Sequence, residues 1–185
     1  MISYLLAGPA TEPVTLAEAK AFLRVDDDAE DGLIATLVAA ARLHVEATAG
    51  RALLTQTWRA VLDAWPTERS VRLPVMPLAS LVAVTAYDPA GQAHALAPGQ
   101  FQTEPAPARL LLPPEIAGLP ALRARLGIEI DYLAGYGDTA ADVPGDLKQA
   151  LLVLVGFWFE HRDSADAVPP AGFERLVMPY RAVRL

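Results

Sequence analysis

The densest group of potential metal ligands is a cluster of five acidic side chains within six residues: Asp26, Asp27, Asp28, Glu30 and Asp31. Calcium prefers carboxylate oxygens, and a calcium-binding loop needs a glycine at its sixth position and a glutamate at its twelfth. Counted from Asp26, these positions hold Asp31 and Leu37, so the spacing does not fit. The acids precede a predicted helix, whose N-terminal dipole favours negative charge. We therefore expect them to cap that helix rather than bind a metal.

Residues of the kinds that serve as nucleophiles or general bases are few and scattered. The sequence has no cysteine, and none of its serines lies in a Gly-x-Ser-x-Gly turn (Ser3, Ser70, Ser80, Ser164). Each histidine stands without a second histidine or a suitably spaced carboxylate (His44, His94, His161). The glycines of "GYGDTA", residues 135–140, lack the third glycine and the lysine of phosphate-binding loops. We expect no enzymatic activity, no cofactor and no metal.

An alternative function remains open at this point. A small ligand-binding or enzymatic domain would use a cleft between helices and a β subdomain, with Tyr136, Asp138 and His161 as its candidate residues. This alternative predicts a monomer or dimer that is stabilised by a small molecule.

Composition indicates a globular protein, with 185 residues of which 53% are hydrophobic and 20% charged. The net charge of -7 argues against a protein that wraps a nucleic-acid duplex, because such proteins present a basic face. The N-terminus has no basic region of the kind that starts a signal peptide. The longest apolar run, 150–159, is too short to span a bilayer. We expect a soluble intracellular protein without a membrane partner.

The C-terminal sequence "FERLVMPYRAVRL", residues 173–185, is basic and apolar although the chain as a whole is acidic. Burying the six large apolar side chains from Leu176 to Leu185 would supply roughly 9–18 kcal/mol. Ordering thirteen backbone units would consume roughly 13–26 kcal/mol, so the segment needs a surface to lie on. That surface is either its own domain or a partner. Residues 169–172 have the composition of a hinge, and Pro179 blocks a continuous helix. We therefore expect residues 169–185 to form an extended docking arm.

Hydrophobic periodicity predicts three helices, over about residues 16–24, 30–49 and 144–162. Thr15 and Glu18 have the spacing of a capping box at the start of the first helix, and Gly50 is placed to end the second. The third helix is apolar on almost every side, so either a neighbouring subunit or the β subdomain must cover part of it, and we expect the neighbouring subunit. The candidate subunit-interface residues are Leu37, Ala41, Leu151, Leu154 and Trp158.

Between the second and third helices the apolar period changes from that of a helix to two. Residues 126–132 alternate most clearly, and Asp88 to Gly91 have the composition of a tight turn between two strands. We therefore predict an α+β fold: a small helical bundle with an inserted, mostly antiparallel β subdomain. The expected parts are helices at 1–54, the β insertion at 55–134, the last helix at 135–168 and the arm at 169–185.

Three segments, in this order, carry a family resemblance: "PVTLAEAKAFLRVDDDAEDGLIATLVAAARLHVEATAGRALLTQTW", "IEIDYLAGYGDTAADVPGDLKQALLVLVGFWFEHR" and "MPYRAVRL". Together they resemble the head-tail connector (adaptor) proteins of tailed bacteriophages and prophages, including those of gene transfer agents. The resemblance covers roughly residues 13–65 and 126–185.

The resemblance implies a structural protein made in the bacterial cytoplasm and assembled into the neck of a virion or gene transfer agent particle. It implies a ring, commonly of about twelve subunits, that joins the portal protein to the next neck or tail protein (the stopper) and lets DNA pass through. A stopper or tail-completion protein is the alternative within this class. The tail residues expected to dock on the portal are Phe173, Arg175, Leu176, Met178, Tyr180, Arg181, Val183, Arg184 and Leu185.

Overall fold

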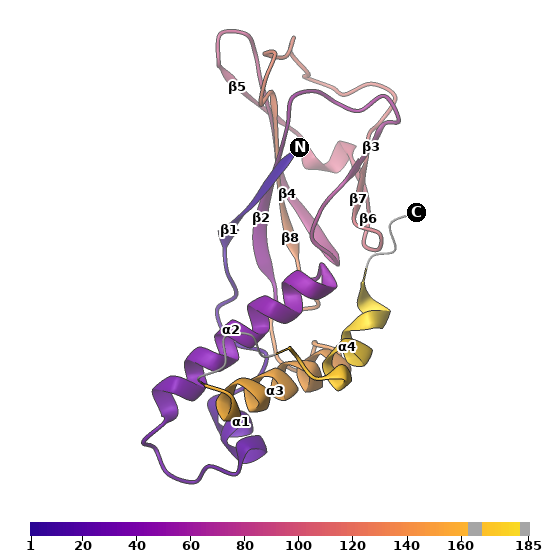
Figure 1. Cartoon of the computed structure of the whole chain (residues 1–185). Helices are drawn as coiled ribbons and strands as arrows, with labels where there is room; N and C mark the ends of the chain where they lie inside the picture. The colour runs from indigo at the N-terminus through magenta and orange to yellow at the C-terminus, as the bar shows by residue number, and fades with distance from the viewer. Residues whose placement is uncertain (163–167, 182–185) are drawn as a thin grey trace. The chain divides into compact units, whose positions relative to one another are not determined.

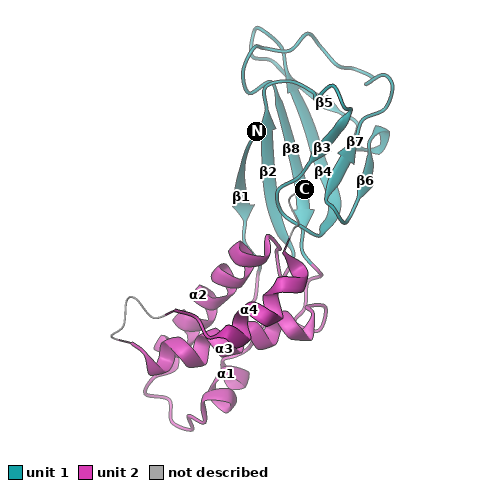
Figure 2. Cartoon of the chain, turned by 45° about the vertical axis from the view of Figure 1, so that its right-hand side comes forward, with its two compact units in different colours: residues 1–9, 55–135 teal, residues 10–54, 136–185 magenta. Residues whose placement is uncertain are grey.

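The computed structural model describes residues 1–162 and 168–181, and the chain forms two compact units. Unit 1 comprises residues 1–9 and 55–135 and contains the strands, whereas unit 2 comprises residues 10–54 and 136–185 and contains the α-helices (Figure 1, Figure 2). The predicted α+β fold is confirmed. One part of the prediction is wrong: residues 1–9 were expected in the helical bundle but belong to the sheet unit.

Unit 2 contains the three predicted helices close to their expected bounds, and a fourth that was not predicted. The helices are α1 (Leu16–Leu23), α2 (Asp31–Ala49), α3 (Gly145–Glu160) and α4 (Ala171–Val177), followed by the 3-10 turn η2 (Met178–Tyr180).

The ends of α1 and α2 form as their sequences predict. The backbone N–H of Glu18 donates to Thr15 Oγ1 at 3.1 Å, and the N–H of Thr15 donates to Glu18 Oε2 at 2.7 Å, which completes the capping box. Gly50 follows α2 with a φ of 65°, a left-handed conformation that favours glycine.

The acidic cluster before α2 does not cap the helix as expected, because the residue at the cap, Glu30, makes no side-chain capping hydrogen bond. Three of the acids, Asp28, Glu30 and Asp31, pair with cations instead. Lys20 Nζ lies 2.7 Å from Asp28 Oδ1 and 2.7 Å from Asp31 Oδ1. Glu30 forms a two-pronged pair with Arg162, at 2.6 and 2.7 Å. These pairs join the start of α2 to α1 and to the end of α3.

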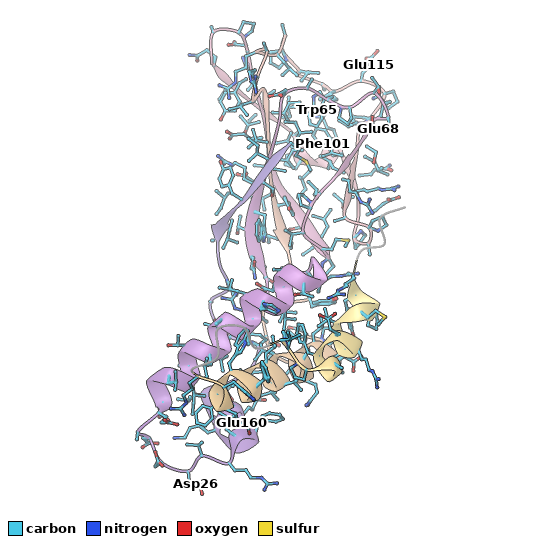
Figure 3. All side chains as sticks on the ribbon, in the orientation of Figure 1. Asp26, Trp65, Glu68, Phe101, Glu115 and Glu160 are labelled. Atoms are coloured by element: carbon cyan, nitrogen blue, oxygen red, sulfur yellow. The ribbon has the colours of Figure 1, made fainter. Side chains whose placement is uncertain are left out.

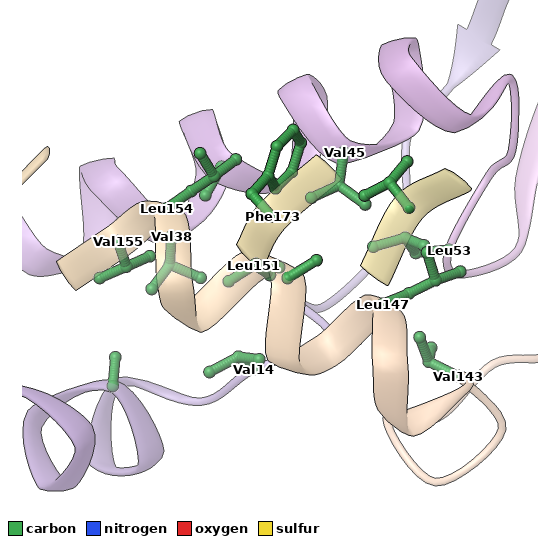
Figure 4. Close-up of a cluster of buried hydrophobic side chains, with 14 of the residues drawn as sticks. Val14, Val38, Val45, Leu53, Val143, Leu147, Leu151, Leu154, Val155 and Phe173 are labelled. Atoms are coloured by element: carbon green, nitrogen blue, oxygen red, sulfur yellow. The ribbon is translucent and has the colours of Figure 1, made fainter. Parts of the chain in front are cut away.

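The core of unit 2 forms where α2 and α3 pack against each other (Figure 4). Its side chains come from positions three or four residues apart, which lie on one face of each helix. The buried residues of the two helices are Ile34, Val38, Ala41, Val45 and Ala49 on α2, and Leu147, Ala150, Leu151, Leu154 and Val155 on α3.

Unit 1 consists of two antiparallel sheets, as expected for the β subdomain. The strands are β1 (Ile2–Ala7), β2 (Gln56–Leu62), β3 (Ser70–Arg72), β4 (Leu78–Tyr87), β5 (Ala93–Leu96), β6 (Gln102–Glu104), β7 (Arg109–Leu111) and β8 (Ile128–Ala134); the 3-10 turn η1 (Pro98–Gln100) precedes β6. The five-stranded sheet has the order β1-β2-β8-β4-β5, and the three-stranded sheet has the order β3-β7-β6.

The central strand β8 has one apolar face and one polar face. Ile128, Ile130 and Tyr132 are fully buried and alternate with partly exposed Glu129 and Asp131. Elsewhere in unit 1, the rings of Trp65 and Phe101, both labelled in Figure 3, lie with their centroids 5.9 Å apart. The two faces of β8 explain its clear period of two in the sequence.

Candidate docking surface at the C-terminal helix

The structure of α4 answers the question raised by the C-terminal sequence. Pro170 precedes the helix in an extended conformation, and its carbonyl accepts a hydrogen bond from the N–H of Phe173 at 2.9 Å. Phe173 and Val177, four residues apart, lie on the same face and are only 1% and 0% exposed. Both belong to the core of unit 2, and α4 packs mainly against α3. Figure 4 shows Phe173 pointing into this core.

The prediction of an extended arm is therefore wrong for residues 171–180, which are helical and packed on their own unit. The physical reason is that the chain's own core supplies the surface that the segment needs. Leu176 and Tyr180 are also partly buried against that core. Pro179 ends the α-helix, as expected, but it does so only after two turns have formed. Val183, Arg184 and Leu185 lie outside the described residues.

Polar and aromatic contacts hold the α4–η2 segment at both ends. Arg51 Nε donates to the backbone carbonyl of Tyr180 at 3.0 Å. The ring of His44 lies 5.4 Å from that of Phe173 and 5.7 Å, edge-on, from that of Trp158. Burial raises the pKa of the Tyr180 hydroxyl, and nearby Asp146 raises it further. His44 is thus a packed aromatic residue rather than a metal ligand.

The outward face of this segment carries positive charge next to an exposed apolar side chain. Arg175 and Arg181 are exposed, and Met178 is 61% exposed. Arg181 pairs with Glu174 at 2.6 Å, whereas Arg175 makes no ion pair with any residue in the described ranges. A thioether beside guanidinium groups suits a partner with an apolar pocket and acidic groups.

The candidate subunit-interface residues do not form an exposed surface. Ala41, Leu151 and Leu154 are 0% exposed and lie in the core of their own chain, so in this fold they cannot reach a neighbour. Leu37 and Trp158 are partly buried against the same core. The periodic pattern correctly marked core positions, but a sequence does not show whether the covering surface belongs to the same chain.

Sequence reasoning missed the exposed apolar residues on the outside of the bundle, notably Phe22, Leu33 and Leu43. The last two lie on α2, which by length and composition alone is apolar enough to cross a membrane. The inward residues of α2 account for part of that hydrophobicity, because they fill the core. The signal available in the sequence was the small number of charges in this helix: Asp31, Arg42 and Glu46.

The residues of the enzymatic alternative are not brought together. Tyr136 precedes α3, packs on the core and interacts with Arg51, whereas His161 follows the other end of α3, where its Nδ1 lies 2.8 Å from the carbonyl of Phe157. All sixteen residues of α3, about 24 Å of helix, lie between them in the chain. Among the described residues, no three His, Asp or Glu side chains are grouped so that they could hold a metal.

One charged cluster lies on the polar face of the five-stranded sheet, in unit 1. Arg59 contacts Asp131 through two hydrogen bonds, at 2.6 and 2.7 Å, and lies 2.9 Å from Glu129 Oε2. Tyr87 donates to the same Glu129 oxygen at 3.0 Å, and the carboxylates raise the pKa of Arg59. Because each member has a partner, the cluster has the character of a cross-strand support rather than a reactive site.

Comparison with known proteins shows what this chain is similar to. The family model of the phage gp6-like head-tail connector protein matches residues 13–91. Residues 13–91 are therefore similar to the phage gp6-like head-tail connector proteins. The match begins before α1 and runs through α2 and β4. The connector resemblance inferred from the sequence is confirmed.

Similar solved structures extend the likeness to the whole chain. A chain from the neck of an empty GTA particle, computed with C6 symmetry, has a TM-score of 0.86 and 27% sequence identity, covering 100% of this chain and 97% of that one. A chain from the virion of a native gene transfer agent (GTA) particle gives the same values. A chain from the neck of a native GTA particle, computed with C12 symmetry, has a TM-score of 0.80 and 26% identity at the same coverage. No curated protein matches this chain.

Proposed function

We propose that this protein is a structural head-tail connector, or adaptor, in the neck of a phage-like particle of the gene transfer agent kind. One observation carries the proposal: the whole chain, both units included, aligns with chains from such particles at TM-scores up to 0.86. In this role the protein joins the capsid portal to the next neck or tail protein, the stopper, and performs no catalysis. Its site of action is the particle neck, after synthesis in the bacterial cytoplasm.

The proposed assembly is a ring of about twelve copies around the DNA channel. The C6 and C12 symmetries of the similar neck structures support a cyclic arrangement. The net charge of -7 supports a conduit, because acidic groups repeated around a ring repel DNA phosphates rather than hold them.

The proposed portal contact is the outward face of the α4–η2 segment together with the residues that follow it. Met178 and Arg175 offer an exposed apolar group and a cation without an ion-pair partner among the described residues. Val183, Arg184 and Leu185 continue this basic and apolar composition. Phe173 and Val177 act indirectly, because their burial holds the outward residues in place.

A capture experiment with the portal protein of the same genome tests this function. Full-length protein should be retained by the immobilised portal, and a chain that ends at Arg181 should be retained much less. Ending the chain at Arg181 keeps α4 intact, whereas removing residues from Phe173 onward would expose the core of unit 2 and confound the result. Full-length protein that is not retained at all would refute the portal-binding function.

An Arg175→Glu variant, compared with Glu68→Arg, then localises the contact. Both residues are exposed and both changes reverse a charge, but Glu68 belongs to unit 1. Arg175→Glu should weaken retention while Glu68→Arg does not. Equal retention of the two variants would rule out the outward face of α4 as the portal contact.

A further inference from the structure

The side of α2 that faces away from the core carries no charged side chain. Its residues are Gly32, Leu33, Thr36, Ala40, Leu43 and Ala47. Leu43 is 57% exposed and Leu33 is 36% exposed. The one polar side chain among them, Thr36, donates its hydroxyl to the carbonyl of Gly32 at 2.8 Å and so needs no outside partner. We call these six residues the outer face of α2.

Such a face is unusual, because the side of a surface helix opposite its core is normally polar. The three charged residues of α2 all lie on one flank, and each has a partner. Arg42 pairs with Glu12 at 2.8 Å and with Glu46 at 3.0 Å, and Asp31 pairs with Lys20 at 2.7 Å. The outer face is therefore uncharged and bordered by neutralised pairs. A charged partner such as DNA gains nothing from it, whereas an uncharged apolar surface matches it.

We propose that the outer face of α2 is the seam along which one copy of this chain packs laterally against the next copy. The inference rests on the proposed ring function and names the surface that closes the ring. Residues 33, 36, 40, 43 and 47 are spaced alternately by three and four, the spacing at which one helix packs lengthwise against another. The small residues between the two leucines allow a close approach. The outer face runs over sixteen residues of α2, from Gly32 to Ala47, and so provides a seam of about 24 Å.

The complementary surface on the neighbouring copy lies around Phe22, at the outside of α1 and α3. Phe22 is 43% exposed, and its ring packs over Gly156, where an added Cβ would come within 3.1 Å of Cε1. The adjoining α3 residues Leu152 and Val153 are partly exposed, and no charge occurs from Ala150 to Phe159.

Because α2 and α3 pack against each other, their outer sides point in opposite directions. Two different, opposed surfaces on one chain produce a head-to-tail contact, and such contacts form a ring when the rotation between successive copies closes. The cyclic symmetries of the similar neck structures agree with this contact type.

Engineered cysteines test the seam directly, because the natural chain contains none. The double variant Leu43→Cys/Gln149→Cys places one thiol on the outer face of α2 and one on the exposed side of α3. Treating the portal-bound protein with a short bismaleimide should give a ladder of covalent multimers from the double variant and only monomers from either single variant. The matched control Ala35→Cys/Gln149→Cys, with its thiol on the charged flank of α2, should remain monomeric. Dimers from Leu43→Cys alone would show that two α2 faces meet, which would overturn the proposal.

A second pair of variants separates the seam from the function on which it rests. Ala40→Glu should reduce the number of copies per portal at least tenfold, while Ala35→Glu, at another exposed position of the same helix, should leave it unchanged. Thermal unfolding of both variants establishes that they fold. Normal loading of Ala40→Glu together with no ladder would refute the seam and leave the function standing. A ladder from concentrated protein that the portal does not retain would support the seam and refute the function.

Discussion

Truncating the side chain of Phe173 tests whether α4 is part of the folded protein before any partner binds. The ring is 1% exposed and contacts the core formed by α2 and α3. Replacing a buried phenylalanine with alanine costs about 3–5 kcal/mol, because apolar burial is lost and a cavity remains. A typical domain is stable by only about 5–15 kcal/mol. We therefore expect Phe173→Ala to remove a large part of the stability of unit 2.

The assay is urea unfolding followed by far-UV circular dichroism at the helical band, since the α-helices belong to unit 2. With a denaturant slope of about 2 kcal/mol/M, the loss lowers the midpoint of the helical transition by about 1.5–2.5 M. The matched control is Met178→Ala, in the adjoining turn. Its side chain is 61% exposed, so its midpoint should change by no more than about 0.3 M.

A helical transition of Phe173→Ala that coincides with that of the unmodified protein would refute the packed α4. That result would mean that the segment is detached in the free protein and orders only on a partner, as an arm would. Hydrogen exchange of the backbone amides from Phe173 to Tyr180 provides an independent check. Slow exchange is expected for the packed helix, and exchange at the rate of an unstructured peptide would contradict it.

Three further predictions concern local supports of the fold. Thr15→Ala should lower the free energy of unfolding by about 1 kcal/mol at neutral pH, because it removes the N-terminal cap of α1; an unchanged urea midpoint would contradict this. The backbone N–H and hydroxyl of Thr15 hold the pKa of Glu18 below its ordinary 4.5. The ionised Glu18 carboxylate therefore stabilises the folded protein above about pH 4.5, and this stabilisation is lost as the pH falls through the pKa that Glu18 has in the folded state. The stability difference between the unmodified protein and Glu18→Gln should shrink towards pH 3. Arg59→Met leaves the carboxylates of Glu129 and Asp131 without their cation and should destabilise unit 1 by about 1–3 kcal/mol; an unchanged thermal unfolding of the sheet unit would show that the cluster contributes nothing.

Much of the fold follows from local sequence signals. The capping box of Thr15 and Glu18, Gly50 after α2, and the turn from Asp88 to Gly91 all form as predicted. Asp88 Oδ1 accepts hydrogen bonds from the backbone N–H groups of Ala90 and Gln92, both at 2.9 Å. These features depend on residues within a few positions of one another, so the sequence alone determines them.

Features that depend on distant parts of the chain were not predictable in the same way. β1 pairs with β2 more than fifty residues away, and its apolar run does not alternate, so its sequence carries no clear strand signal. α4 forms because Phe173 and Val177 find a core built from α2 and α3, whereas an energy balance for the isolated segment omits that surface. The exposed apolar outer face of α2 emerges only once the buried face of the same helix is known.

Imaging the complex with the portal shows whether many copies of this chain form a ring there. Purified protein is added in excess to the portal of the same genome, and the captured particles are classified by electron microscopy without imposed symmetry. We expect a ring of about twelve copies with rotational symmetry on one face of the portal. Portals without added density, or with a single bound copy, would refute the ring.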